Sequence, residues 1–160
     1  MPDPVLESAR HLVGESLTDL RSSIEGLPVE ALNWRPAGDD SNSLFVLATH
    51  TLHATRLWLC IAMGAPLPDR DRNSEFQGMA DDAGDCLSLV DELSEDCRAA
   101  LRSAEGADWA ARRLTQGRGG DAPPEVTAAH ALIHATEHLR GHVDQMSLTR
   151  RLWEQRSPAP

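Results

Sequence analysis

Apolar residues recur at every third or fourth position in four long segments of the chain, the spacing of one face of an α-helix. These segments lie at about residues 4–25, 41–64, 82–104 and 125–155. No segment shows the alternation of apolar and polar residues that is typical of a half-buried strand. The sequence therefore predicts an all-α fold, a four-helix bundle with no sheet.

Helix-ending and helix-starting residues mark the limits of these segments. Gly26 follows the first segment, and Ser41 or Ser43 precedes the second as an N-cap. Residues 65–80 contain two prolines and no periodicity, which predicts a long crossover connection between the second and third helices. The Pro-Pro-Glu sequence at 123–125 suits the first turn of the fourth helix.

The length of the chain, 160 residues, fits one domain. We expect this domain to span residues 1–157 and to be followed by a disordered tail at 158–160. No window holds 18 uninterrupted apolar residues, so no transmembrane helix is expected. The N-terminus lacks the basic and apolar regions of a signal peptide. These features predict a cytoplasmic protein.

The charge of the chain excludes two classes of partner. Its formal net charge at pH 7 is −10, whereas nucleic-acid binding needs a basic face. Anionic membrane surfaces are disfavoured for the same reason. Cys60, Cys86 and Cys97 form no CxxC pair, so we interpret them as reduced structural thiols. A small-molecule ligand or a protein partner remains.

Four histidines stand at strict i, i+4 spacing on the last predicted helix: His130, His134, His138 and His142. Successive members are rotated by about 40°, so they form one slanted ridge in which neighbours can share a ligand. Rotation along the ridge brings His142 closest to the apolar side of the helix, His138 next and His130 farthest. Gln145 falls in the same sector.

Two further histidines, His50 and His53, lie in the middle of the second predicted helix. His50 is near the centre of the apolar stripe, and His53 is rotated about 60° toward its edge. A buried imidazole must have both nitrogens satisfied. A carbonyl or carboxylate would satisfy a lone core histidine, but a divalent ion would satisfy His50 and the opposite ridge together. Three imidazoles with an open position are typical of a catalytic metal site.

Other chemistries lack their motifs. The sequence has no HExxH, no E-x-x-H pair, no G-x-S-x-G elbow and no glycine-rich phosphate loop. These absences argue against a zincin, a ferritin-like di-iron bundle, an α/β-hydrolase and a nucleotide-binding fold.

Two separated segments are distinctive: SNSLFVLATHTLHATRLWL, preceded by LPVEALNWRP, and HATEHLRGHVDQMSLTRRLW. Together with the piece RDRNSEF after the second helix, they resemble the DinB-like (DinB/YfiT-like) superfamily. The resemblance implies a four-helix bundle with a long crossover, and a divalent ion, zinc or nickel, bound by His50, His138 and His142. Because His134 is an extra member of the ridge, the pair His134/His138 is a rival to His138/His142.

The resemblance also implies a function. Members with assigned activity are metal-dependent thiol transferases that use a low-molecular-weight thiol such as mycothiol or bacillithiol, and related members isomerise maleylpyruvate with mycothiol. We expect the thiol and an electrophile as partners, and His53 or His134 as the base or as the residue that orients a ligand. A non-catalytic metal- or ligand-binding stress-response bundle is the alternative. The oligomeric state is open, with a homodimer as one candidate.

Overall fold

The computed structural model describes residues 3–102, 107–116 and 124–156. Within them, four long helices confirm the predicted all-α architecture: α1 (Pro4–Ser22), α3 (Leu44–Met63), α5 (Ala83–Arg102) and α6 (Ala128–Gln155). Two short helices, α2 (Val29–Asn33) and α4 (Arg72–Glu75), and a 3-10 turn at Gly38–Asp40 lie in the connections. The predicted tail at 158–160 lies outside the described residues.

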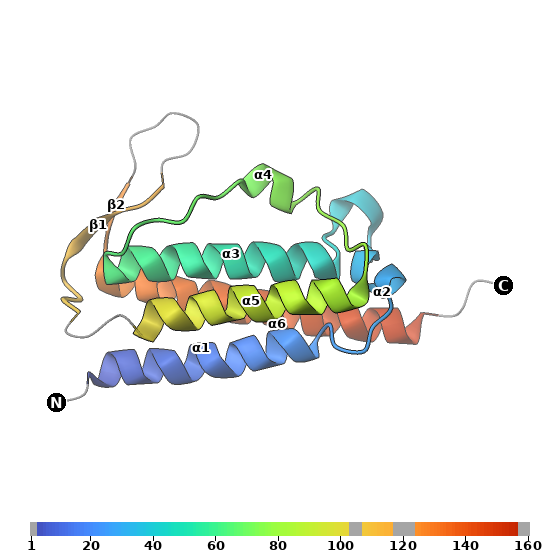
Figure 1. Ribbon diagram of the computed structural model, residues 1–160, viewed down its shortest axis with the longest axis horizontal. Coiled ribbons are helices and arrows are strands. Elements are labelled where there is room, and N and C mark those ends of the chain that lie inside the picture. The colour runs from blue at the N-terminus through green and yellow to red at the C-terminus, as the bar shows by residue number, and fades with distance from the viewer. Residues whose placement is uncertain (1–2, 103–106, 117–123, 157–160) are drawn as a thin grey trace.

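The four long helices form a bundle in which α3 packs against α5 and α6, and α1 packs against the same two helices (Figure 1). The crossover after α3 returns the chain along the length of the bundle, so α3 and α5 run parallel while α6 runs back beside α1. This crossover was predicted from residues 65–80, and it carries α4 over the outer side of α3 (Figure 1).

Local chemistry sets the limits of α3, the central helix of the site. The hydroxyl of Ser43 accepts a hydrogen bond from the backbone N–H of Val46 at 3.2 Å, which makes Ser43 the N-cap. Gly64 ends the helix with a φ of 66°, a left-handed conformation that favours glycine. Both ends agree with the prediction, in which Ser43 was one of two candidate caps.

One expectation was wrong: the structure contains a small sheet. Strands β1 (Arg112–Leu114) and β2 (Glu125–Thr127) pair antiparallel, with Arg113 opposite Val126. Each strand has three residues, which is too short for an alternating pattern to be recognised. Glu125 therefore belongs to a strand and not to a first helical turn, and α6 begins at Ala128 with Thr127 as its N-cap.

The core lies between the long helices and is built mainly from leucine and alanine side chains that are almost completely buried. The segment Gly38–Met63 is long and apolar enough to cross a membrane by length and composition alone. However, 78% of its most apolar window is buried inside the bundle, and the core helix of a globular protein passes the same test.

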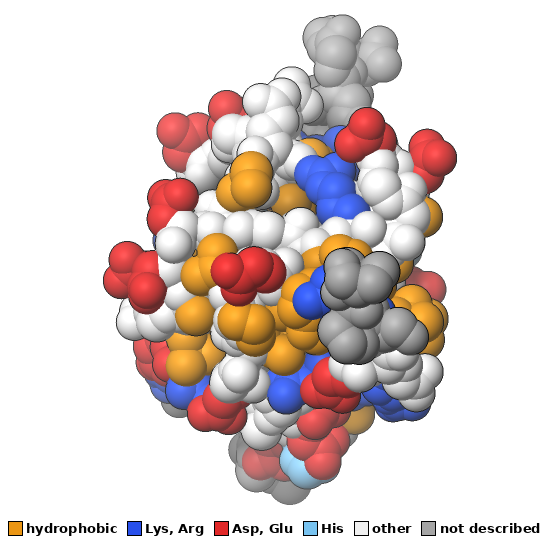
Figure 2. Space-filling view, turned by 90° about the vertical axis from the view of Figure 1, so that its right-hand side faces the viewer, with side chains coloured by type: hydrophobic (Ala, Val, Ile, Leu, Met, Phe, Trp, Pro, Cys, Tyr) orange, Lys and Arg blue, Asp and Glu red, His pale blue; other side chains and the backbone are white. Residues whose placement is uncertain are grey.

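The end of the bundle that carries α2 is closed by aromatic packing. Trp34, directly after α2, contacts Trp153 of α6 edge-on, with ring centroids 5.7 Å apart. Hydrophobic side chains gather near the middle of this end face, and acidic side chains surround them (Figure 2). The two tryptophans therefore pack at a bundle end, away from the histidines.

Candidate metal centre

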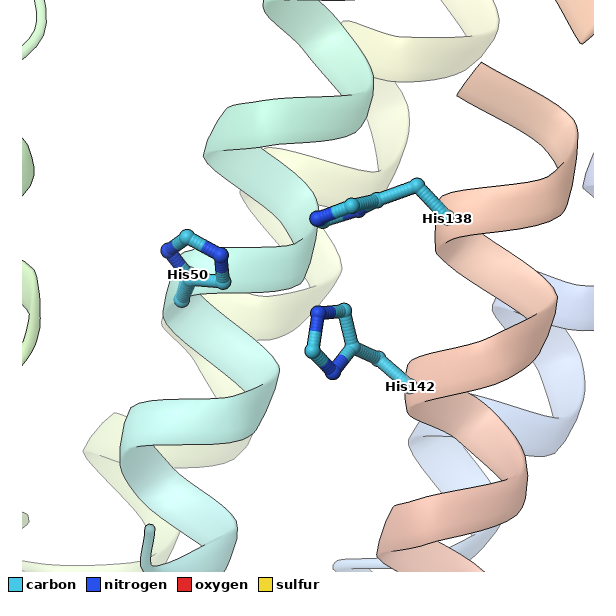
Figure 3. A group of neighbouring side chains, drawn as sticks. All are labelled: His50, His138 and His142. Carbon is cyan, nitrogen blue, oxygen red and sulfur yellow. The ribbon is translucent and has the colours of Figure 1, made fainter. Parts of the chain in front are cut away.

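Three histidines from two helices converge in the middle of the bundle. His50 comes from α3, and His138 and His142 come from successive turns of α6 (Figure 3). One ring nitrogen from each lies within 4.8 Å of the others. Nitrogens bound to one tetrahedral ion lie about 3.3 Å apart, because each is about 2.0–2.1 Å from the ion. Small rotations of the side chains would therefore bring all three onto one ion.

The donor set fits a divalent ion. The Nδ1 atom of His138 is buried and has no hydrogen-bond partner among the described residues, so an ion bound at that atom would relieve the cost of leaving it unsatisfied. Burial, together with the nearby His142 and His50, lowers the pKa of His138 to about 4. Burial also lowers the pKa of His142. Both rings are therefore neutral at pH 7, the form that coordinates metals.

A buried carboxylate holds the third ring. Glu75 of α4 lies 2.9 Å from Nδ1 of His50, and both side chains are less than a tenth exposed. Burial alone would raise the pKa of Glu75, but hydrogen bonds from His50 and Arg70, with their charges, lower it to about 2. An ionised carboxylate only accepts, so Nδ1 of His50 carries the proton and Nε2 is left for an ion.

The carboxylate of Glu75 is balanced by the guanidinium of Arg70. The two groups form a two-pronged ion pair, with Nε to Oε1 at 2.7 Å and Nη2 to Oε2 at 2.8 Å. Arg70 and Glu75 are 8% and 5% exposed. Both residues belong to the crossover, so this segment contributes directly to the surroundings of His50.

The ring of His142 is held from its own helix. Oε1 of Gln145 lies 3.1 Å from its Nδ1, one turn further along α6. The prediction that Gln145 shares the histidine sector is therefore confirmed. Asp144 is exposed and forms an ion pair with Arg140, on the other side of the helix. Thus both His50 and His142 have a partner at Nδ1.

An open pocket of about 330 Å³ lies over two of these histidines. Its walls come from α6: His134, Glu137, His138, Gly141, His142 and Gln145. A volume of this size is at the lower end of the range of small-molecule sites. A small ligand that enters this pocket would therefore reach the side chains that would hold the ion.

The other predicted site residues occupy different places. His134 lines the pocket, and its ring contacts Trp58 of α3 with centroids 4.3 Å apart. His53 is half-buried, does not line the pocket, and has a pKa lowered chiefly by burial. The geometry brings His50 together with His138 and His142, and leaves His53 and His134 outside the cluster.

The three cysteines take no part in the site. Cys60, Cys86 and Cys97 are free and buried, as the sequence predicted. Burial raises the pKa of Cys86 to about 11, and burial together with the nearby Asp96 raises that of Cys97 to about 12. The raised pKa values keep both thiols protonated near neutral pH, which makes them poor nucleophiles, and none of the three cysteines belongs to the histidine cluster.

Sequence analysis missed the roles of Arg70 and Glu75. The segment RDRNSEF was noted only as part of a resemblance. A short run of charged residues in an aperiodic connection gives no sign of which helix it will cover. The one available signal was the need of a buried His50 for a partner at its second nitrogen.

Comparisons with known proteins agree with this fold. A protein of Enterococcus faecalis, described as a conserved protein of locus, superposes with a TM-score of 0.71 at 14% identity, over 97% of this chain and all of the other. A mutant of the mycothiol-dependent maleylpyruvate isomerase superposes with a TM-score of 0.65 at 15% identity. This match covers 91% of the present chain and 61% of the isomerase.

At such low identity the two structures establish the fold alone. No curated protein matches the sequence significantly. The profile of the DinB superfamily matches residues 13–146, which include His50, His138 and His142. This match covers most of the chain, and all three histidines that converge in the structure lie within it. The chain belongs to the DinB superfamily.

Proposed function

We propose that the protein is a divalent-metal-dependent thiol S-transferase that uses a low-molecular-weight thiol such as mycothiol or bacillithiol. The observation that carries this proposal is the open pocket over His138 and His142 of the three-histidine cluster. A purely structural metal site is normally closed by four protein ligands. Here three protein ligands meet beside a space of about 330 Å³, in which a small ligand fits.

Each residue has a defined task in this mechanism. His50, His138 and His142 would hold a zinc or nickel ion, and Glu75 and Gln145 would fix the rings of His50 and His142. A bound dication lowers the pKa of a coordinated thiol enough to give a thiolate at neutral pH.

His134 is the better of the two candidate bases, because it lines the pocket and His53 does not. A ring nitrogen of His134 takes the proton from the thiol. The sulfur then forms a bond to an electrophilic carbon of the second substrate, and the leaving group departs with its bonding electrons. The likeness to the mycothiol-dependent maleylpyruvate isomerase supports a thiol as the co-substrate. We also propose that this chemistry takes place in the cytoplasm.

The test is a thiol-consumption assay on protein loaded with zinc or nickel. Loss of the free thiol is followed with mycothiol, bacillithiol and cysteine against a panel of electrophiles, including epoxides and alkyl halides. We expect consumption that depends on metal and that His142→Ala abolishes. Glu30→Gln, an exposed acid in α2 remote from the cluster, is the matched control. Stoichiometric metal binding without consumption of any thiol would favour the non-catalytic bundle.

A further inference from the structure

The ridge of histidines continues beyond the three that converge. The ring centroids of His138 and His134 are 5.8 Å apart, and those of His134 and His130 are 6.2 Å apart. The outer end of the ridge reaches solvent, because His130 is exposed whereas His134, His138 and His142 are half-buried. The metal centre, where His138 and His142 meet the buried His50 of α3, thus lies at the inner end of a row of imidazoles that begins in solvent.

The outer two histidines have the spacing of a chelating pair. They are four residues apart on α6, a spacing that puts their Cβ atoms about 5–6 Å apart on one face. Their rings are nearly parallel, with an interplanar angle of 3°. Neither ring has a hydrogen-bond partner within residues 3–102, 107–116 and 124–156, so their nitrogens are not committed to the protein. His130 is exposed and its ring can therefore turn onto a shared ion.

A tryptophan of the neighbouring helix supports this pair. Trp58 of α3 lies edge-on to both rings, with centroids 4.3 Å from His134 and 6.5 Å from His130. This packing limits the positions that the inner ring can adopt, which reduces the entropy lost when it binds an ion. It also puts an indole next to the pair, where a paramagnetic ion would quench its fluorescence.

We propose that His130 and His134 form a second, weaker site for a late-transition divalent cation, and that this site loads the three-histidine centre. Two imidazoles hold the ion during loading and water completes its coordination. Once the ion has passed to the cluster, the ring of His134 is free to act as the base. Imidazole donors suit nickel, copper and zinc, whereas calcium and magnesium prefer oxygen ligands. Two protein donors in solvent bind more weakly than three in a half-buried cluster, so the two sites differ in affinity.

The loading role follows from the position of His134. It is the neighbour of His130 on one side and of His138 on the other, so an ion can exchange one imidazole at a time along the ridge. An ion that entered through the open pocket over His138 and His142 would instead have to exchange several waters for imidazoles at the cluster itself. This part of the proposal rests on the metal centre described above, whereas the second site itself does not.

The site is tested by titrating the metal-free protein with Ni²⁺, with calorimetry to count the ions and tryptophan fluorescence to locate the weaker one. We expect two ions per chain, the weaker bound at least tenfold less tightly. The variants His130→Ala and His134→Ala should each bind only the tighter of the two ions. His11→Ala is the matched control, because His11 is an exposed histidine of α1, and it should keep both. Trp58→Phe should lose the fluorescence change of the weaker ion while keeping its heat signal.

The loading role is tested by rapid mixing of metal-free protein with substoichiometric Ni²⁺, followed at set times by a chelator that strips only the weaker site. We expect His130→Ala to slow filling of the tight site severalfold without changing its equilibrium affinity. A weaker site that survives in His130→Ala would overturn the second site, and an unchanged filling rate would overturn the loading role. A third outcome separates the two claims. If the wild type binds only the weaker ion and His130→Ala loses it, the second site is supported and the three-histidine metal centre is contradicted.

Discussion

The substitution Glu75→Gln should weaken metal binding from outside the ligand set. The amide oxygen of the new side chain still accepts from Nδ1 of His50, but the negative charge and the two-pronged pair with Arg70 are lost. A carboxylate partner makes a ligand histidine more basic, and loss of such a partner costs about 10- to 100-fold in metal affinity.

The same substitution should also destabilise the protein. Arg70 and Glu75 are 8% and 5% exposed, so the change leaves a buried guanidinium without its counter-charge. Breaking a buried ion pair from one side costs about 3–5 kcal/mol. Because the introduced amide oxygen still accepts one hydrogen bond, we expect a loss at the lower end of this range, about 3 kcal/mol, in the free energy of unfolding of the metal-free protein.

A double variant separates these two effects. In Glu75→Gln/Arg70→Met the amide oxygen still accepts from Nδ1 of His50. The guanidinium that the single change leaves without a counter-charge is replaced by an apolar side chain of similar size, a change that is often neutral for stability. We expect urea unfolding of the metal-free double variant to lie within about 1 kcal/mol of the wild type. Its metal affinity, measured by competition with a chromophoric chelator, should stay at least tenfold weaker. If the double variant recovers both its stability and its metal affinity, Glu75 does not act by positioning His50. Docking of the crossover against α3 would then explain the whole effect of the single substitution.

Two other expectations concern stability. Gly64→Ala should cost about 1–2 kcal/mol in urea unfolding, because φ is 66° there and a new Cβ would lie 3.1 Å from Nη2 of Arg113. Gly14→Ala, in α1 with open space around it, should instead stabilise the protein by about 0.5–1 kcal/mol. Equal effects of the two substitutions would contradict the role given to the left-handed conformation of Gly64. The free energy of unfolding of the metal-free protein should fall by about 2 kcal/mol as the pH is lowered from 6.5 to 4.5. The pKa of His138 is about 4 in the folded protein and about 6.5 in the unfolded chain, so over this range only the unfolded chain takes up the proton. Unfolding curves of His138→Gln should show a smaller loss, and an equal loss would assign the effect to other groups.

The sequence predicted the helices well, because long amphipathic segments encode their own geometry. The limits of α3 could be read from Ser43 and Gly64, whose side-chain and backbone chemistry are local. The hairpin β1–β2 could not be predicted, because its three-residue strands are held by pairing across a connection rather than by a pattern of their own.

The candidate site was predictable to the extent that helical spacing determines it. Rotation along α6 ordered the histidines from His142 to His130, and the structure puts His138 and His142 opposite His50. The contribution of Glu75 was not predictable, because it depends on the path of the crossover across α3. Such long-range placement of an aperiodic segment is set by tertiary packing.

Metal content after extensive dialysis tests the central claim most directly. Elemental analysis of the purified protein should find one tightly held divalent ion per chain, zinc or nickel. His142→Ala and His50→Ala should each reduce that ion to a small fraction, whereas His53→Ala should retain it, because His53 lies outside the cluster. Full retention of the ion in both His142→Ala and His50→Ala would contradict a metal centre built from these three histidines.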